Sequence, residues 1–240
     1  MLGSGDAFSS HGRFMSGYFI DAGARILLEA GPTVLTALKR AGVSAPDIDL
    51  VLISHPHGDH FGGLPFLLLE YMWEKPRTTI LTIAGPRNLE ARTWRLFRTM
   101  YPGSDISRIA RWIRFEVIEP GDSRRIGPAR VTAIRTPHMT RDKSLAFRIE
   151  VGGRTIAFSG DSGWTEELVP LCVGADLFLC EATLAHGDLD GQPRGHLSLT
   201  EAETAFEASG AGTLLVTHRP SELPVPHNRL LAFDGLQIDV

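Results

Sequence analysis

Four residues that can bind a metal ion lie within six positions of this sequence, in the segment HPHGDH at 55–60. His55 and His57, two residues apart on a predicted loop, can point their imidazoles at one cation. Asp59 and His60 then face a second position beside it. Imidazole suits zinc, manganese or iron, so this spacing predicts a metal site rather than a set of solvated or capping histidines.

Three further residues of this kind each follow a short apolar segment. His138 comes after VTAIRTP, Asp161 after RTIAFSG, and His218 after TLLVT. Because functional side chains of α/β proteins gather at the ends of strands, we expect these residues to meet the segment 55–60. The seven side chains together are enough for two divalent cations that share Asp161.

The segments around these residues alternate between strand and helix patterns. Short apolar stretches bounded by turn residues predict strands at 17–20, 24–29, 49–53, 80–84, 115–118, 130–134, 145–151, 154–158, 175–180 and 213–216. Apolar residues at helical spacing predict helices at 32–41, 64–72 and 200–209. Since no break in composition divides the chain, we expect a single α/β domain over residues 1–240, with two packed sheets and helices outside.

Composition and charge limit the class of protein. The chain has 240 residues, of which 43% are hydrophobic and 22% charged, as in globular proteins with a large core. No apolar stretch reaches the ~18 residues of a membrane span and no secretory signal is found, so a cytoplasmic protein without membrane contact is expected. Cys172 and Cys180 are expected to be buried free thiols. The net charge of −4 argues against a surface coated in positive charge for nucleic acid.

At these positions the sequence resembles a known group of enzymes. HPHGDH, the isolated His138, SGDSG around Asp161 and VTH at 216–218 resemble the metal-binding motifs of the metallo-β-lactamase superfamily. Four other segments are similar to the ribonuclease Z-like phosphodiesterase branch: LGSGDAF at 2–8, SLAFRIE at 144–150, CEAT at 180–183 and GHLSLTEA at 195–202. The resemblance covers nearly the whole chain.

The resemblance implies an αββα sandwich of two mixed β-sheets flanked by helices, and a homodimer. It also implies a centre of two metals with ligands shared out as follows: His55, His57 and His138 on one, Asp59, His60 and His218 on the other, and Asp161 bridging. Zinc is the first expected cation, with manganese and iron as alternatives. The resemblance further implies His196 as proton donor to the leaving oxygen, with Glu181 orienting it.

These residues suit hydrolysis of a phosphodiester by a hydroxide that bridges the two metals. Asp59 could accept the proton of the attacking water as well as bind metal. His196, cationic near neutral pH beside a carboxylate, could protonate the leaving oxygen. The catalytic candidates are therefore Asp59, His196 and Glu181. The alternatives are that His196 only precedes a helix cap at Ser198 or Thr200, and that Glu181 only caps a turn.

Two departures from the ribonuclease Z pattern concern the substrate. Long-form enzymes carry an arm for tRNA between the third histidine and the bridging aspartate, but His138 and Asp161 are only 23 positions apart, which one hairpin fills. Cys180 stands where the family motif begins with histidine, and Leu197 interrupts its His-Ser-Thr motif. The sequence thus favours a small phosphodiester, such as a cyclic nucleotide, a cyclic phosphate or a short RNA end, over a long tRNA.

Two other functions fit the same motifs. Hydrolysis of an ester, thioester or lactone is one, because the same activated water attacks an acyl carbon. The other is a protein that binds a ligand or partner and keeps the metal for structure alone. Phosphodiester hydrolysis is preferred because poor alkoxide leaving groups most need the proton that GHLS at 195–198 would supply.

The segment 92–130 is rich in arginine, with nine arginines against four acids. Its spacing predicts an amphipathic helix with Trp94, Phe97 and Tyr101 inward and the neighbouring arginines in solvent. A substrate lid or a dimer contact is the alternative, in which guanidinium and aromatic groups would hold phosphate and base.

Overall fold

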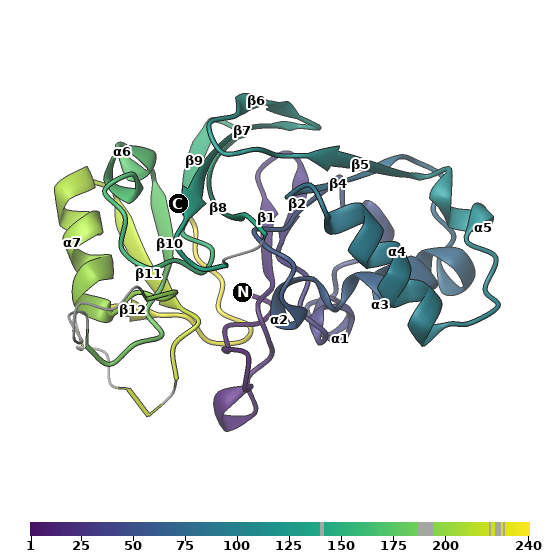
Figure 1. Ribbon diagram of the computed structural model, residues 1–240, viewed down its shortest axis with the longest axis horizontal. Coiled ribbons are helices and arrows are strands. Elements are labelled where there is room, and N and C mark those ends of the chain that lie inside the picture. The colour runs from purple at the N-terminus through teal and green to yellow at the C-terminus, as the bar shows by residue number, and fades with distance from the viewer. Residues whose placement is uncertain (140–141, 187–193, 221, 224–226, 228) are drawn as a thin grey trace.

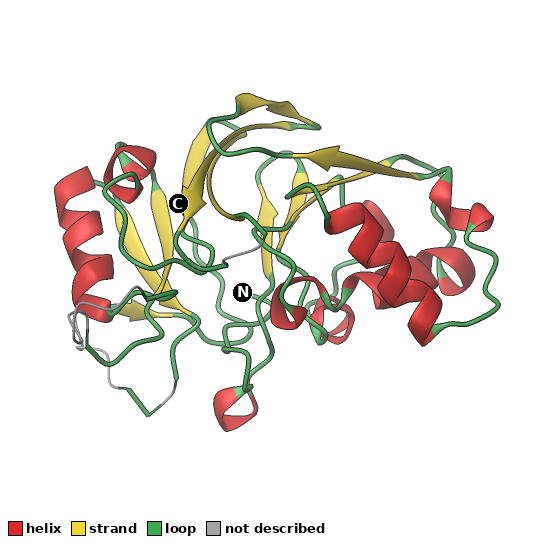
Figure 2. Cartoon of the chain, viewed as in Figure 1, coloured by secondary structure: helices red, strands yellow, loops and turns green. Residues whose placement is uncertain are grey.

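Two β-sheets lie face to face between two groups of helices in the computed structural model of the chain (Figures 1 and 2). The structure describes residues 1–139, 142–186, 194–220, 222–223, 227 and 229–240. Both sheets mix parallel and antiparallel neighbours. This four-layer arrangement is the αββα sandwich that the resemblance implied.

The first sheet has five strands in the order β1-β2-β3-β4-β5. Their bounds are β1 (Tyr18–Asp21), β2 (Arg25–Leu28), β3 (Leu50–Leu52), β4 (Leu81–Gly85) and β5 (Ile113–Val117). The β1–β2 pair is an antiparallel hairpin, and the other neighbours run parallel. The hairpin turns at Gly23, whose φ of 74° is in the left-handed region that favours glycine.

Helices and short turns pack on the outer face of this sheet. The longer ones are α1 (Val34–Arg40), α3 (Leu64–Leu69) and α4 (Leu89–Met100). The shorter ones are η2 (Ala45–Asp47), α2 (Gly58–Phe61), the π-helix η3 (Glu70–Glu74) and α5 (Ser107–Ala110). The predicted helix at 64–72 is thus an α-helix that continues as a π-helix. The 3₁₀-helix η1 (Ser10–Gly12) buries no residue.

The second sheet has seven strands in the order β12-β11-β10-β9-β8-β7-β6. Their bounds are β6 (Ser123–Ile126), β7 (Ala129–Thr136), β8 (Ser144–Val151), β9 (Arg154–Phe158), β10 (Leu177–Glu181), β11 (Thr213–Thr217) and β12 (Leu230–Leu231). From β9 to β12 the strands are parallel, and from β6 to β9 they are antiparallel. Helices α6 (Leu168–Cys172) and α7 (Leu199–Ser209) cover its outer face.

Apolar side chains fill three layers, one between the sheets and one under each group of helices. Successive residues of a strand point to opposite faces, so Leu50 and Leu52 of β3 join the layer between the sheets while Val51 joins the layer under the helices. A strand buried on both faces must be apolar throughout, which explains why β3 has no polar residue.

The strand directions bring the candidate residues to one edge of the sandwich. Because β7 and β9 are both antiparallel to β8, they point the same way as each other and as β10 and β11. His138, Asp161, Glu181 and His218 therefore all lie at carboxyl ends of strands on the same edge of the second sheet.

The predicted loop at 55–60 is wrong in its second half. Residues Gly58–Phe61 form one helical turn, α2, in which the N–H of Phe61 donates to the carbonyl of His57 at 3.1 Å. A single turn is too short to leave a periodic apolar pattern, so the sequence does not indicate it. The turn carries Asp59 and His60, which lie in a different group of potential ligands from His55 and His57.

Several other short elements have no counterpart in the prediction, among them β6, β12, α5 and α6. Strand β6 carries two arginines and buries only Ile126, β12 has two residues, and α6 has five. Elsewhere the burial agrees with expectation, since Cys172 and Cys180 are both buried free thiols. None of the helices within the described ranges is long and apolar enough to cross a membrane.

Candidate metal centre

All seven predicted metal-binding side chains meet between the two sheets. They form two groups, within each of which the potential ligand atoms lie within 4.8 Å of one another: His55, His57 and His138 in the first, and Asp59, His60, Asp161 and His218 in the second. Residues 55–60 come from the five-stranded sheet and the other three from the seven-stranded sheet, so both halves of the sandwich contribute.

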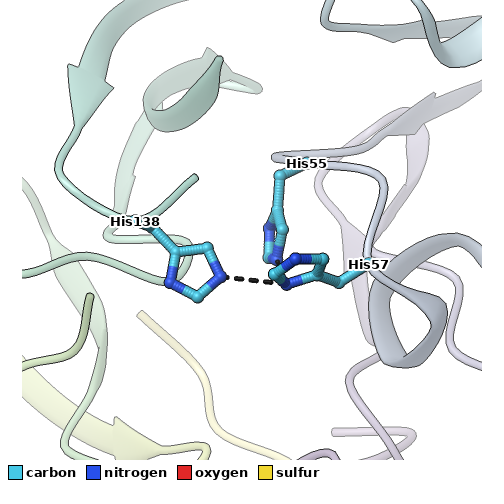
Figure 3. A group of neighbouring side chains, drawn as sticks. All are labelled: His55, His57 and His138. Atoms are coloured by element: carbon cyan, nitrogen blue, oxygen red, sulfur yellow. Dashed lines mark hydrogen bonds between the residues drawn. The ribbon is translucent and has the colours of Figure 1, made fainter. Parts of the chain in front are cut away.

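The first group is three histidines whose ring nitrogens converge (Figure 3). His57 Nδ1 lies 3.0 Å from His55 Nε2 and 3.0 Å from His138 Nε2. Nitrogen ligands at ~2.0–2.1 Å from a tetrahedral zinc ion are separated by roughly 3.3 Å, so the three nitrogens fit one cation with little movement. Burial lowers the pKa of all three imidazoles, which keeps their lone pairs free.

The second group places two histidines against two carboxylates. His60 Nε2 lies 3.2 Å from Asp59 Oδ2 and 3.3 Å from Asp161 Oδ2, and His218 Nε2 lies 3.2 Å from Asp59 Oδ2. Neither buried ring nitrogen of His60 makes a well-directed hydrogen bond within the described part of the chain. A cation among these atoms would give His60 the partner it lacks, so the donor set fits a divalent metal ion.

The histidines and carboxylates of the second group shift one another's pKa values. Burial alone would raise the pKa of the Asp161 carboxyl, but the facing His218 and His60 outweigh it and hold that pKa well below its usual range. Burial alone would lower the pKa of His60, but Asp161 outweighs it and raises that pKa well above its usual range. The ionised carboxylates are thus stabilised by nearby positive charge, which a divalent cation would also supply.

Asp161 lies between the two groups. Its Oδ2 atom is 3.3 Å from His60 Nε2, 3.7 Å from His138 Nε2 and 3.8 Å from His55 Nε2. Only a residue placed at the boundary reaches nitrogens of both groups, so its position suits the bridging role that the resemblance implied.

In His55 and His138, the ring nitrogen that faces away from the centre contacts an oxygen atom of the protein. His55 Nδ1 lies 2.9 Å from Ser54 Oγ, and His138 Nδ1 lies 2.7 Å from the carbonyl oxygen of Gly195. The carbonyl can only accept, so His138 carries its proton on Nδ1 and presents the unprotonated Nε2 to the centre.

Glu29 is a buried acid near the centre that the motifs do not single out. Its Oε2 lies 3.5 Å from His60 Nδ1, and its Oε1 accepts a hydrogen bond from the Ser54 N–H at 2.9 Å. It is fully buried at the end of β2, with a φ of 61° that non-glycine residues rarely adopt. In the sequence, Glu29 directly follows the apolar residues ILL, just as Glu181 directly follows the apolar residues LFLC.

His196 and Glu181, the predicted proton donor and its partner, are brought together beside the metal candidates. His196 Nδ1 lies 2.9 Å from Glu181 Oε1. Although burial would lower the pKa of His196, its hydrogen bond to Glu181 outweighs this and raises that pKa to about 9. The His196 ring lies 4.8 Å from the His138 ring and 5.9 Å from the His218 ring, measured between centroids.

The helix cap named in the alternative interpretation is present, at Ser198. Ser198 caps α7, since its hydroxyl accepts from the Glu201 N–H while the Glu201 carboxylate accepts from the Ser198 N–H. The cap fixes the start of the helix, so that His196 two residues earlier is directed at Glu181.

The segment around α4 agrees with the amphipathic interpretation. Phe97 is fully buried and Trp94 packs against it and against Phe115, whereas Arg92, Arg95 and Arg98 are exposed. Among the described residues between His138 and Asp161, β8 and β9 pair as an antiparallel hairpin, as predicted.

Comparison with known proteins places the chain in a family. The family model of the anti-Pycsar protein Apyc1 matches residues 1–201. The chain is 28% identical to a ribonuclease Z of Brevibacillus brevis, over 90% of this chain and 83% of that one. It is 26% identical to the probable metallo-hydrolase YhfI of Bacillus subtilis, over 92% and 86%.

Solved structures agree with the sequence relatives. The human short-form tRNase Z superposes with a TM-score of 0.79 at 27% identity, covering 99% of this chain and 97% of that one. The metallo-β-lactamase fold protein YhfI superposes with a TM-score of 0.78. With this fold, these hydrolase relatives and a His/Asp cluster able to bind metal, the chain belongs to the Apyc1 family of ribonuclease Z-like hydrolases in the metallo-β-lactamase superfamily.

Proposed function

We propose that this protein hydrolyses a small phosphodiester, such as a cyclic nucleotide, a cyclic phosphate or a short RNA end. The observation that carries this proposal is the hydrogen-bonded pair of His196 and Glu181 next to the two groups of metal-binding side chains. A phosphodiester with an alkoxide leaving group needs both a bound electrophile and a proton donor. An activated acyl substrate needs the donor far less.

Two divalent cations, zinc in the first place, would occupy the centre. His55, His57 and His138 would hold one ion, Asp59, His60 and His218 would hold the other, and Asp161 would bridge them. When bound, such a pair of cations polarises the phosphoryl group and lowers the pKa of the attacking water to near 7.

The remaining chemistry belongs to the side chains. Water attacks phosphorus, the bond from phosphorus to the leaving oxygen breaks, and Asp59 takes a proton from the water. His196 donates a proton from Nε2 to the leaving oxygen, while Glu181 holds Nδ1 and stabilises the imidazolium form before the transfer. The raised pKa of His196 supports this role because the ring carries its proton at neutral pH.

The size of the substrate follows from what lies between His138 and Asp161. The described residues there form the hairpin of β8 and β9, which leaves no room in the sequence for an arm that grips tRNA. We therefore place long tRNA outside the substrate range.

The test compares two substrates that differ in leaving group. Protein loaded with zinc or manganese is assayed with bis(p-nitrophenyl) phosphate, whose leaving group needs no proton, and with a 3′,5′-cyclic nucleotide, whose alkoxide does. His57→Ala should abolish turnover of both. His196→Ala should lower kcat for the cyclic nucleotide by about 10²–10⁴-fold and for the nitrophenyl ester far less. His11→Ala, at a histidine exposed on the surface, is the matched control.

Two results would contradict the proposal. Turnover in His57→Ala equal to that of the unmodified protein would exclude the centre as the active site. Hydrolysis of lactones or thioesters without any phosphodiester turnover would assign the same centre to acyl substrates.

A further inference from the structure

The Glu181 carboxylate holds more than His196. Its Oε1 accepts from His196 Nδ1 at 2.9 Å and from the Ser162 N–H at 2.8 Å. Its Oε2 accepts from the Thr183 N–H at 3.1 Å and from the Thr183 hydroxyl at 2.6 Å. Both carboxylate oxygens of Glu181 therefore accept hydrogen bonds, Oε1 from His196 and Ser162 and Oε2 from Thr183.

Thr183 also contacts His218 through the same hydroxyl group. Its Oγ1 lies 3.0 Å from His218 Nδ1 and 2.8 Å from the His218 carbonyl oxygen. The hydroxyl therefore has three oxygen or nitrogen neighbours but only one proton.

Counting protons determines how these contacts are arranged. The hydroxyl proton goes to Glu181 Oε2, which is the closest acceptor and the charged one. With that proton used, the contact to His218 Nδ1 is a hydrogen bond only if the imidazole donates it. His218 then carries a proton on Nδ1, and its Nε2 faces Asp59 Oδ2 at 3.2 Å in the second group of the centre.

We infer that Thr183 is a positioning residue that fixes the orientation and tautomer of His218 for the cation, and joins it to the carboxylate that holds His196. The chain of contacts runs from His196 through Glu181 and Thr183 to His218. One hydroxyl thereby couples the candidate proton donor to the candidate metal site. A φ of 50° at His218 shows that its backbone is also held in a conformation that needs outside support.

The experiment separates the hydroxyl from the rest of the side chain. Thr183→Val keeps the shape and removes the hydroxyl, whereas Thr183→Ser keeps the hydroxyl and removes a methyl group. Zinc alone is titrated against each variant in competition with a chromophoric chelator. Thr183→Val should weaken zinc binding by about 10–100-fold, as for other residues that orient a metal-binding histidine, and Thr183→Ser should restore it. Thr204→Val, at an exposed threonine whose hydroxyl donates to the Thr200 carbonyl of its own helix, is the control.

A second readout reports the tautomer directly. In the zinc-loaded protein, the ¹⁵N imidazole spectrum should show a protonated Nδ1 for His218 whose proton exchanges slowly with water. That exchange should become fast in Thr183→Val and stay slow in Thr183→Ser. A general loss of folding would not give this difference between the two variants.

Within this inference, only the link to His196 rests on the proposed function. The positioning of His218 and the proposed function can therefore fail separately. Zinc affinity in Thr183→Val equal to that of the unmodified protein would overturn the inference, as would Thr183→Ser binding as weakly as Thr183→Val. If zinc binding changes as expected but no phosphodiester is hydrolysed, the positioning role stands and the proposed function fails.

Discussion

Contacts within the protein orient individual side chains of this centre. His138 and His218 each direct Nδ1 to an oxygen of the protein and Nε2 to the centre. His57 is reversed, with Nδ1 facing the other two histidines of its group. Such anchoring reduces the rearrangement needed when a cation binds, because the tautomer is already selected.

Glu29 is the residue whose removal tests this anchoring most directly. Glu29→Ala leaves the buried N–H of Ser54 without its acceptor, so the free energy of unfolding should fall by about 1–3 kcal/mol. Glu29→Gln keeps an acceptor for Ser54 but removes the carboxyl group that faces His60 Nδ1, so it should be more stable than Glu29→Ala yet bind zinc more weakly than the unmodified protein. Urea denaturation of metal-free protein and zinc titration measure the two effects. Equal stability of Glu29→Ala and unmodified protein would contradict this.

At the scale of elements, helix α4 contacts the residues that lead into β8. Asp142, two residues before β8, accepts a hydrogen bond from Asn88 Nδ2 at 2.8 Å and is paired with Arg92. The Nζ atom of the next residue, Lys143, lies 2.5 Å from Glu119 Oε2. Part of the arginine-rich segment therefore has a structural task, namely to hold an element of the other sheet that ends beside the centre.

Removing this support should loosen the residues that lead into β8 without unfolding the protein. In Asp142→Ala the amides next to His138 should exchange with solvent at least several-fold faster, because local opening loses two restraining contacts. The free energy of global unfolding should change by less than about 1 kcal/mol, as is usual for partly exposed ion pairs. Hydrogen exchange with mass spectrometry measures the first effect. Arg95→Ala, at an exposed position of the same helix, is the control, and unchanged exchange near His138 in Asp142→Ala would refute the support.

At the scale of the whole molecule, the centre joins the two sheets. His55, His57, Asp59 and His60 follow β3 of one sheet, whereas His138, Asp161 and His218 follow strands of the other. A cation held by both sets binds only the folded arrangement, so its binding free energy adds to the free energy of unfolding.

Removal of metal should therefore lower the thermal stability. With free zinc at 100 times its dissociation constant, each occupied site adds about 2.7 kcal/mol, which in a chain of this size raises Tm by roughly 5–10 °C. His57→Ala should lose part of this increase and His11→Ala should keep all of it. Thermal unfolding with zinc and with EDTA measures the difference. The same Tm in both conditions would show that the centre does not bind zinc in the folded state.

Local features of the sequence predicted much of the fold and of the candidate metal centre. The seven metal candidates, Glu181 and His196 were predicted because each follows an apolar strand or stands in a motif, and both signals are short-range. The single hairpin between His138 and Asp161 was predicted, and its turn at Val151–Arg154 uses two glycines with positive φ values of 57° and 77°. Two packed sheets with helices outside were predicted from the mixed strand and helix patterns, and the αββα arrangement from the resemblance.

Tertiary structure alone decided the contacts between residues that are far apart in the chain. Glu29 meets His60 from a different strand, Thr183 meets His218 across 35 positions, and Asp142 meets Arg92 across 50. Each of these pairings depends on strand order and direction, which short-range patterns do not encode. The helical turn α2 and strands β6 and β12 were missed because they are too short to repeat a pattern. They form because neighbouring elements provide their hydrogen bonds and burial.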